Sequence, residues 1–267
     1  MTEIKVLFLG DVYARAGKDA VRVMMPALRE KYKPDVVIAN GENIAGGFGI
    51  TENLAQKLFR YGVDVITLGN HTWNKRDELG NALDVYENLL RPANYPPGNP
   101  GHGWTIFSTE DSVKVGVINL MGRVYMPVID CPFRIGRDIV EKIRRETKII
   151  IVDFHAEATS EKVAMGHYLD GLVSAVVGTH THIQTADEKI LPGGTAYITD
   201  CGMTGPHDSV IGVKKNIVIE HFLRSVQMRF EPASGGVRIQ GVFIKIDAAT
   251  GFAKHIERVD IPVELFD

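Results

Sequence analysis

Two histidines separated by a single residue follow the apolar residues 176–178. In the extended backbone at the end of a strand, residues i and i+2 point to the same side, so His180 and His182 can address one point in space. Paired imidazoles in this arrangement are typical of a chelated transition metal. The alternative is a pair of ordinary loop histidines whose nitrogens bond to backbone carbonyls. Ligand-type residues at other strand ends would favour the metal.

Four more apolar segments end in residues that can bind a metal or transfer a proton. Directly after these segments stand Asp11, Glu42 with Asn43, Asn70 with His71, and His155. Alone, each has an ordinary explanation, because Asp caps helices and Asn favours turns. Their repetition at the ends of successive predicted strands indicates one shared site.

The segments that would position these residues alternate between strand and helix patterns. In the first 80 residues, strands are predicted at 4–9, 35–39 and 64–68, and helices at 21–32 and 51–61. This alternation is typical of a parallel sheet with right-handed crossovers, in which ligands collect at the carboxyl ends of the strands.

The second part of the chain continues the alternation and then changes. Strands are predicted at 113–120, 149–154, 172–178 and 195–199, and helices at 135–145 and 160–169. From residue 217 onward we expect antiparallel strands, with turns at 234–236 and 249–251. The Pro- and Gly-rich residues 91–103 are interpreted as a surface connection. We therefore expect one domain over residues 1–267, and the strand pattern alone favours a three-layer α/β fold.

The composition limits the classes of partner. The 267 residues carry a net charge of -3, so no basic excess drives non-specific binding to nucleic acid. Cys131 and Cys201 are the only cysteines, which excludes a disulfide framework and indicates a reducing compartment. We found neither a signal peptide nor an apolar run long enough for a membrane helix, and we expect a cytoplasmic protein. A homo-oligomer is left open.

The candidate ligands combine carboxylate, amide oxygen and imidazole without thiolate, which favours Mn, Fe or Zn over a structural zinc site. Seven candidates are too many for one ion and suit two ions bridged by a carboxylate. Two such ions, ~3.5–4 Å apart, can share a water as hydroxide and clamp a phosphoryl group for in-line attack. His71, which is not needed as a ligand, can then protonate the leaving oxygen as general acid.

In this order, the motifs resemble those of calcineurin-like metallophosphoesterases. Gly69-Asn70-His71 and Gly178-Thr179-His180-Thr181-His182 are specific for that superfamily. Gly41-Glu42-Asn43 and the motif from Asp200 through Gly202-Met203-Thr204 to Pro206 are similar to those of the YmdB-type bacterial phosphodiesterases. The resemblance implies a four-layer αββα sandwich of two mixed sheets flanked by helices, a binuclear centre of Fe or Mn ahead of Zn, and hydrolysis of phosphodiesters such as 2′,3′-cyclic nucleotides.

The resemblance also implies how the ligands are divided. The first metal would take Asp11, Glu42, Asn43 and His182, and the second would take Glu42, Asn70, His155 and His180. Compared with the wider superfamily, Tyr13 stands where a histidine is usual, so Asn43 would substitute for that ligand. The sequence does not identify what orients His71, because Thr72-Trp73 replaces the usual acidic residue.

Several weaker signals accompany this site. Gly202, Met203 and Thr204 are predicted to contact substrate, and His207 is close enough in sequence to join them. The Gly-rich residues 46–49 could cradle a phosphate. Cys201 is interpreted as a buried small residue, not a nucleophile.

Two other functions use the same residues. One is a phosphomonoesterase, which would prefer p-nitrophenyl phosphate to a diester. The other is a regulatory protein that captures a nucleotide or an RNA end with little turnover. The presence of His71 argues against the second, because binding alone does not need an acid for the leaving group.

Overall fold

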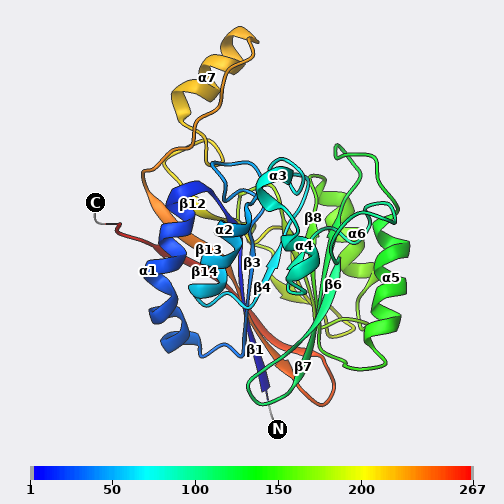
Figure 1. Cartoon of the computed structure of the whole chain (residues 1–267). Coiled ribbons are helices and arrows are strands. Elements are labelled where there is room, and N and C mark those ends of the chain that lie inside the picture. Colours follow the sequence, from blue (N-terminus) through cyan, green and yellow to red (C-terminus); the bar gives the residue numbers. More distant parts are fainter. Residues whose placement is uncertain (1–2, 266–267) are drawn as a thin grey trace.

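The computed structural model describes residues 3–265, which form two β-sheets with helices on their outer faces (Figure 1). The eight-stranded sheet contains β1 (Glu3–Leu9), β2 (Asp11–Val12), β3 (Val36–Asn40), β4 (Val65–Thr67), β5 (Leu89–Leu90), β12 (Met203–Pro206), β13 (Val237–Asp247) and β14 (Ala253–Pro262). The six-stranded sheet contains β6 (Trp104–Ser108), β7 (Lys114–Met121), β8 (Ile150–His155), β9 (Ala175–Thr179), β10 (Lys189–Ile190) and β11 (Ala196–Ile198).

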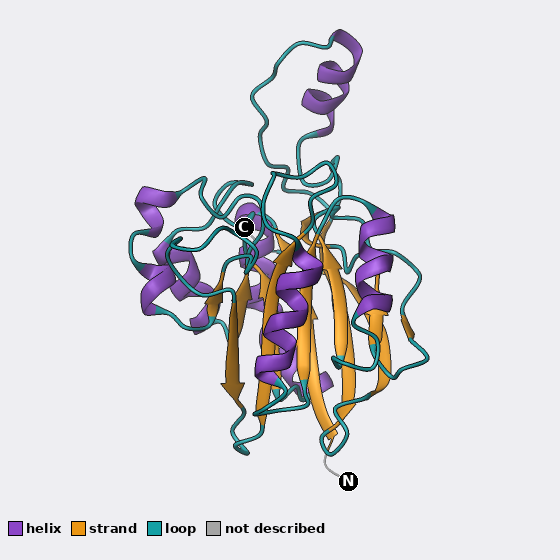
Figure 2. Ribbon diagram, turned by 90° about the vertical axis from the view of Figure 1, so that its right-hand side faces the viewer, coloured by secondary structure: helices purple, strands orange, loops and turns teal. Residues whose placement is uncertain are grey.

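The helices are α1 (Ala14–Tyr32), α2 (Glu52–Arg60), α3 (Arg76–Leu79), α4 (Ala82–Val85), α5 (Pro132–Ile143), α6 (Thr159–Tyr168) and α7 (Lys215–Arg224). Helices α1 and α2 share an apolar core with the outer face of the larger sheet, and α5 and α6 share another with the smaller sheet. Figure 2 shows the helices beside the strands, with α7 projecting from one end. No helix among residues 3–265 is both long and apolar enough to cross a membrane.

The continuous apolar strands are explained by burial on both faces of each sheet. In β1, Val6 and Phe8 point into a core that they share with Val117 of β7 and Ile151 of β8, so this core lies between the sheets. The alternate residue Leu7 points into the core under α1 and α2. The four-layer αββα sandwich is therefore confirmed, and the three-layer expectation from strands alone is wrong.

The parallel strands bring their carboxyl ends to one side of the molecule. Strands β1, β3, β4 and β5 are parallel neighbours in the larger sheet, as are β7, β8, β9 and β11 in the smaller one. In Figure 1 these ends lie at the top, opposite the N-terminus, and α7 projects from the same side. The antiparallel pair β13 and β14, with turns near 234–236 and 249–251, agrees with the prediction.

One part of the prediction is wrong: residues 215–224 form α7, where strand alternation was expected from residue 217. The consecutive β-branched residues 217–219 favour a strand locally. The structure instead stabilises the helix with an ion pair between Glu220 and Arg224, one turn apart, and ends it at Ser225 in the left-handed conformation.

Candidate active site

All seven candidate metal ligands lie at the carboxyl ends of the strands and contact one another. Asp11 begins β2, Glu42 and Asn43 follow β3, Asn70 follows β4, His155 ends β8, and His180 and His182 follow β9. Asp11, Glu42 and His155 are completely buried. The contacts form two neighbouring groups that share Glu42.

One group surrounds His155 and contains the residues that the resemblance assigns to the second metal. Its Nε2 lies 3.0 Å from Glu42 Oε1, 3.0 Å from Asn70 Oδ1 and 3.1 Å from His180 Nδ1. Ligand atoms of Glu42, His155 and His180 all lie within 4.8 Å of one another, close enough for one ion to reach all three.

The imidazole rings of His155 and His180 each form a hydrogen bond on the side away from the centre, and these bonds fix which ring nitrogens face the centre. Thr179 donates its hydroxyl proton to Asp153 Oδ1 over 2.7 Å, so its oxygen accepts from His155 Nδ1 over 2.9 Å. His180 Nε2 lies 3.0 Å from Glu157 Oε2 and donates to it. The nitrogens that face the centre are therefore His155 Nε2 and His180 Nδ1, and both present lone pairs there when the two rings are neutral. A group of acceptors of this kind fits a bound cation.

The pKa values of His155 and His180 indicate that the site favours one positive charge. Complete burial disfavours a charged His155, yet the neighbouring Glu42 carboxylate raises its pKa to about 9. Burial and the charge on His155 lower the pKa of His180 to about 3. The site thus attracts one positive charge while keeping the second imidazole available as a neutral ligand.

The second group joins Asp11, Asn43 and His182. Asn43 Nδ2 lies 3.3 Å from Asp11 Oδ1 and 3.2 Å from His182 Nε2, and His182 donates from Nδ1 to the Ile211 carbonyl over 2.9 Å. Burial disfavours the Asp11 carboxylate, but the hydrogen bond and charge of His182 hold its pKa well below the usual range. Asn43 would bind a metal through Oδ1, which requires a half-turn of its amide.

Glu42 links the two groups. Its Oε1 lies near His155 and 3.3 Å from Asn43 Nδ2, and its Oε2 accepts the backbone N–H of His71 over 2.8 Å. Burial opposes the charge, but His155 lowers the pKa of the Glu42 carboxyl. An ionised carboxylate between two groups of ligands has the position expected of a bridge.

His71 lies at the edge of this centre and is half-buried. Its ring packs edge-on against Phe48, with ring centroids 5.1 Å apart. Phe48 belongs to the Gly-rich residues 46–49, so this loop lies beside His71. Sequence reasoning missed this contact, which packs an aromatic ring against His71.

The paired histidines do not address one point: His180 lies beside His155, and His182 lies beside Asp11 and Asn43. His180 and His182 have φ values of +102° and +65°, so the extended-backbone argument is wrong. The turn between them is held by Asp200, whose Oδ2 accepts both the backbone N–H and the hydroxyl of Thr181. Lys162, buried on α6, lies 2.7 Å from the same oxygen. This network holds two residues in a conformation that is unfavourable for non-glycine residues.

Sequence reasoning also missed the residues that support the ligands, although one signal was present. Asp153 interrupts an otherwise apolar buried strand two residues before His155, which is unusual for a charged residue. Its carboxylate accepts from Thr67, Thr179 and Asn40, and burial raises its pKa to about 6.

Glycine at position 69 is required by packing. A Cβ there would overlap the ring of His155 and the carboxylate of Glu42. The glycine of the Gly-Asn-His motif thus lets the chain pass directly over the metal-ligand candidates.

The residues predicted to contact substrate are buried. Met203 and Thr204, which follow Gly202, form β12 and pair with Asp11 and Val12 of β2. His207 is held by the Met203 carbonyl, 3.0 Å from its Nε2. This strand supports Asp11 from behind, and the geometry gives no support to a substrate contact by its side chains. Cys201 is also buried, which raises the pKa of its thiol far above the usual value.

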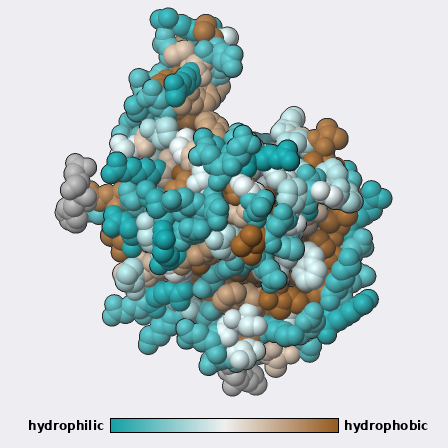
Figure 3. All heavy atoms as spheres, viewed as in Figure 1, coloured by the Kyte–Doolittle hydropathy of each residue, from teal (hydrophilic) through white to brown (hydrophobic). Residues whose placement is uncertain are grey.

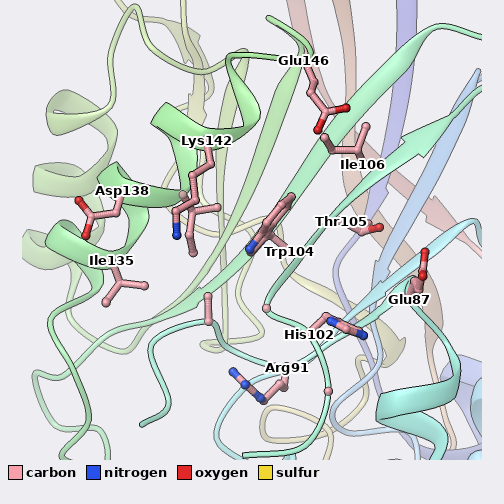
Figure 4. Close-up of a pocket in the computed structure, with 14 residues that line it drawn as sticks. Glu87, Arg91, His102, Trp104, Thr105, Ile106, Ile135, Asp138, Lys142 and Glu146 are labelled. Atoms are coloured by element: carbon pink, nitrogen blue, oxygen red, sulfur yellow. The ribbon is translucent and has the colours of Figure 1, made fainter. Parts of the chain in front are cut away.

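A separate hollow of about 640 Å³ lies between α5 and β6 and contains none of the candidate ligands (Figure 4). Figure 4 shows Asp138 and Lys142 of α5 on one wall, with Trp104 of β6 nearby. The guanidinium of Arg91, which also lines the hollow, donates to the carbonyls of Pro92, Asn99 and Pro100. These bonds tie Arg91 to the Pro-rich connection.

Comparisons with known proteins cover nearly the whole chain. A family model described as YmdB-like protein matches residues 7–259. A 2′,3′-cyclic-nucleotide 2′-phosphodiesterase of Bacillus subtilis (strain 168) is 48% identical over 256 residues, which are 96% of this chain and 96% of the relative.

Two solved structures are similar throughout. A crystal structure described as a novel phosphatase from Mycoplasma pneumoniae has a TM-score of 0.92 and 37% identity, covering 98% of this chain and 94% of the other. A hypothetical protein from Thermus thermophilus has a TM-score of 0.89 and 40% identity, covering 97% of this chain and 99% of the other.

Proposed function

The chain belongs to the YmdB-like protein family, and on that premise we propose that it hydrolyses phosphodiesters, 2′,3′-cyclic nucleotides among them, with two metal ions. It is a hydrolytic enzyme with a metallophosphoesterase-type fold, and such a fold implies divalent metal ions. The observation that carries the proposal is the group of acceptor atoms around His155 Nε2, with Glu42 Oε1 and Asn70 Oδ1 each 3.0 Å away. When both rings are neutral these atoms are all acceptors, so the group favours a cation at its centre, either the proton that His155 holds or a metal ion in its place.

The residues are proposed to hold the two ions in two groups. Asp11, Asn43 and His182 would bind one ion, Asn70, His155 and His180 the other, and Glu42 both. The absence of thiolate, together with imidazole and carboxylate donors, suits Fe or Mn. When bound, two such metal ions lower the pKa of a water molecule between them and balance the charge of a phosphoryl group.

His71 is proposed to protonate the leaving oxygen. Its half-buried ring can receive a proton from solvent, while Phe48 holds the ring edge-on and Glu42 holds its backbone. His71 is therefore fixed beside the candidate ligands without itself joining the contacts around His155. A positioned acid of this kind contributes about 10²- to 10⁴-fold to turnover.

The proposal is tested with chelator-treated protein and two diesters, bis-p-nitrophenyl phosphate and a 2′,3′-cyclic nucleotide. We expect hydrolysis of both to disappear and to return when Mn or Fe is added. Unchanged turnover in metal-free protein would refute the metal-dependent reaction. Faster hydrolysis of p-nitrophenyl phosphate than of the diester would favour the phosphomonoesterase.

The role of His71 is tested by His71→Ala, with His167→Ala on the exposed face of α6 as the matched control. We expect His71→Ala to lower turnover about 10²- to 10⁴-fold with metal content unchanged, and the control to keep full turnover. A loss of metal from His71→Ala would show that His71 is a ligand.

A further inference from the structure

An exposed phenyl ring lies beside the proposed general acid. Phe48 is 38% exposed, and its ring centroid lies 5.1 Å from that of His71. Figure 3 shows a mainly hydrophilic face, with brown residues gathered in small patches. The other exposed aromatic side chains among residues 3–265 are Tyr125, Tyr168, Phe222, Phe230 and Phe252. Within that range, none of these five pairs with the ring of a residue of the candidate site. Single exposed apolar side chains are common on protein surfaces, so the position of Phe48 is the feature to explain.

The loop that carries Phe48 is held against the candidate site at both ends. The carbonyl of Asn43, a proposed metal ligand, accepts the N–H of Gly47 over 3.0 Å. At the other end, Gly49 has a φ of +81°, and a Cβ there would lie only 2.9 Å from the side chain of Lys75. The loop therefore packs closely on the segment that follows the proposed general acid. These two anchors keep the phenyl ring beside the site.

The proposed reaction determines on which side of the phosphate the nucleoside lies. In a 2′,3′-cyclic nucleotide, the phosphate is bonded to two oxygens of one ribose, and the same ribose carries the base. In-line attack expels one of these oxygens on the side opposite to the attacking water. Because His71 is proposed to protonate that oxygen, the ribose and its base lie on the side of His71. The base is one sugar ring away from the leaving oxygen, and Phe48 is the exposed aromatic residue in contact with His71.

The loop is better suited to a nucleobase than to a phosphate. The N–H groups of Gly46, Gly47 and Phe48 donate to carbonyls of residues 43–45, so the loop does not offer them to a phosphate. Its side chains carry no charge. An aromatic side chain instead binds a base by stacking, because every base has a flat π-face, and one such contact raises affinity about 5- to 100-fold. Stacking would also remove the exposed part of the phenyl ring from water.

We propose that Phe48 stacks on the base of the substrate, and that this contact makes the enzyme prefer nucleoside 2′,3′-cyclic phosphates to phosphodiesters without a base. The inference rests on the proposed function, because it uses His71 as the acid for the leaving ribose oxygen. A purine presents a larger flat surface than a pyrimidine, so adenine gains more from the contact than uracil. Phe48 is thus a residue that binds substrate and sets specificity, next to the residue that transfers the proton.

Phe48→Ala tests the contact, and Phe48→Tyr is the conservative variant that keeps the ring. The matched control is Phe252→Ala, because Phe252 is a 44% exposed phenylalanine in the turn between β13 and β14, at the other end of the sheet. The substrates are 2′,3′-cyclic AMP and the 2′,3′-cyclic phosphate of methyl ribofuranoside, which has a methoxy group in place of the base. We expect Phe48→Ala to raise KM for cyclic AMP about 5- to 100-fold with kcat nearly unchanged, and to leave KM for the base-free diester as in wild type. Phe48→Tyr and the control should behave as wild type with both substrates.

The outcomes separate base binding from other roles of Phe48. Circular dichroism and metal content by mass spectrometry check that the variants are folded and loaded. An equal loss of turnover with both substrates would overturn the proposal and show that the ring acts only on His71. An unchanged KM for cyclic AMP in Phe48→Ala would overturn it as well, whereas a larger rise in KM for cyclic AMP than for 2′,3′-cyclic UMP would support stacking. A wild type that hydrolyses neither diester would refute the proposed function itself, and this inference with it.

Discussion

Replacing Thr179 with valine should weaken metal binding without touching any candidate ligand. The Thr179 hydroxyl accepts from His155 Nδ1 and donates to the buried carboxylate of Asp153. Valine fills a similar space but leaves the N–H of a fully buried ring without an acceptor. An unpaired buried donor costs about 1–3 kcal/mol, and losing a support of this kind lowers metal affinity about 10- to 100-fold.

The matched control is Thr67→Val. Thr67 also donates its hydroxyl to Asp153, but among residues 3–265 its side chain makes no hydrogen bond to His155. Metal affinity is measured by competition with a chelating dye, and stability by urea unfolding. We expect both variants to lose stability and only Thr179→Val to lose affinity by the stated factor. Equal affinities in the two variants would refute the idea that Thr179 fixes the orientation of the imidazole.

Four further predictions concern the site and its support. Burial opposes the charge on His155, but Glu42 raises its pKa to about 9, so metal uptake near neutral pH must release this proton. Metal affinity should therefore rise about tenfold per pH unit between about pH 6 and 8, and a pH-independent affinity would contradict this. The same proton stabilises the chelator-treated fold fully below about pH 6.5, and this stability is lost as the pH rises through about 9. Gly69→Ala should abolish metal binding, because the added Cβ overlaps His155 and Glu42, and a normal metal content by mass spectrometry would disprove the packing argument. Lys162→Met leaves Asp200 buried without its partner and should cost about 3–5 kcal/mol in urea unfolding, so an unchanged midpoint would show that the pair contributes little.

The sequence predicted the positions of the candidate ligands because each follows a buried strand. Asp11, Glu42 and His155 each stand at or just after the end of a strand. Parallel strands bring these ends to one side of the molecule. An apolar segment shows that a strand is buried on both faces, but it does not show whether a helix or a second sheet covers each face. The core between the sheets joins residues far apart in sequence, such as Val6 and Ile151, so only the family resemblance predicted four layers.

The support around the ligands was not predictable for a similar reason. Asp153 bonds to Asn40, 113 residues away, and Glu157 reaches His180 from a loop. The backbone of His180 is left-handed because Asp200 and Lys162 hold the next turn, which no local propensity encodes. Helix α7 was missed because its β-branched residues resemble a strand when no packing partner is known.

The number and place of the bound metals test the central claim most directly. Crystals of the protein loaded with Mn or Fe can be measured by anomalous scattering at both metal edges. We predict two peaks, one on each side of the Glu42 carboxylate, one near His182 and the other near His155. A single peak, or peaks away from Glu42, would contradict the account.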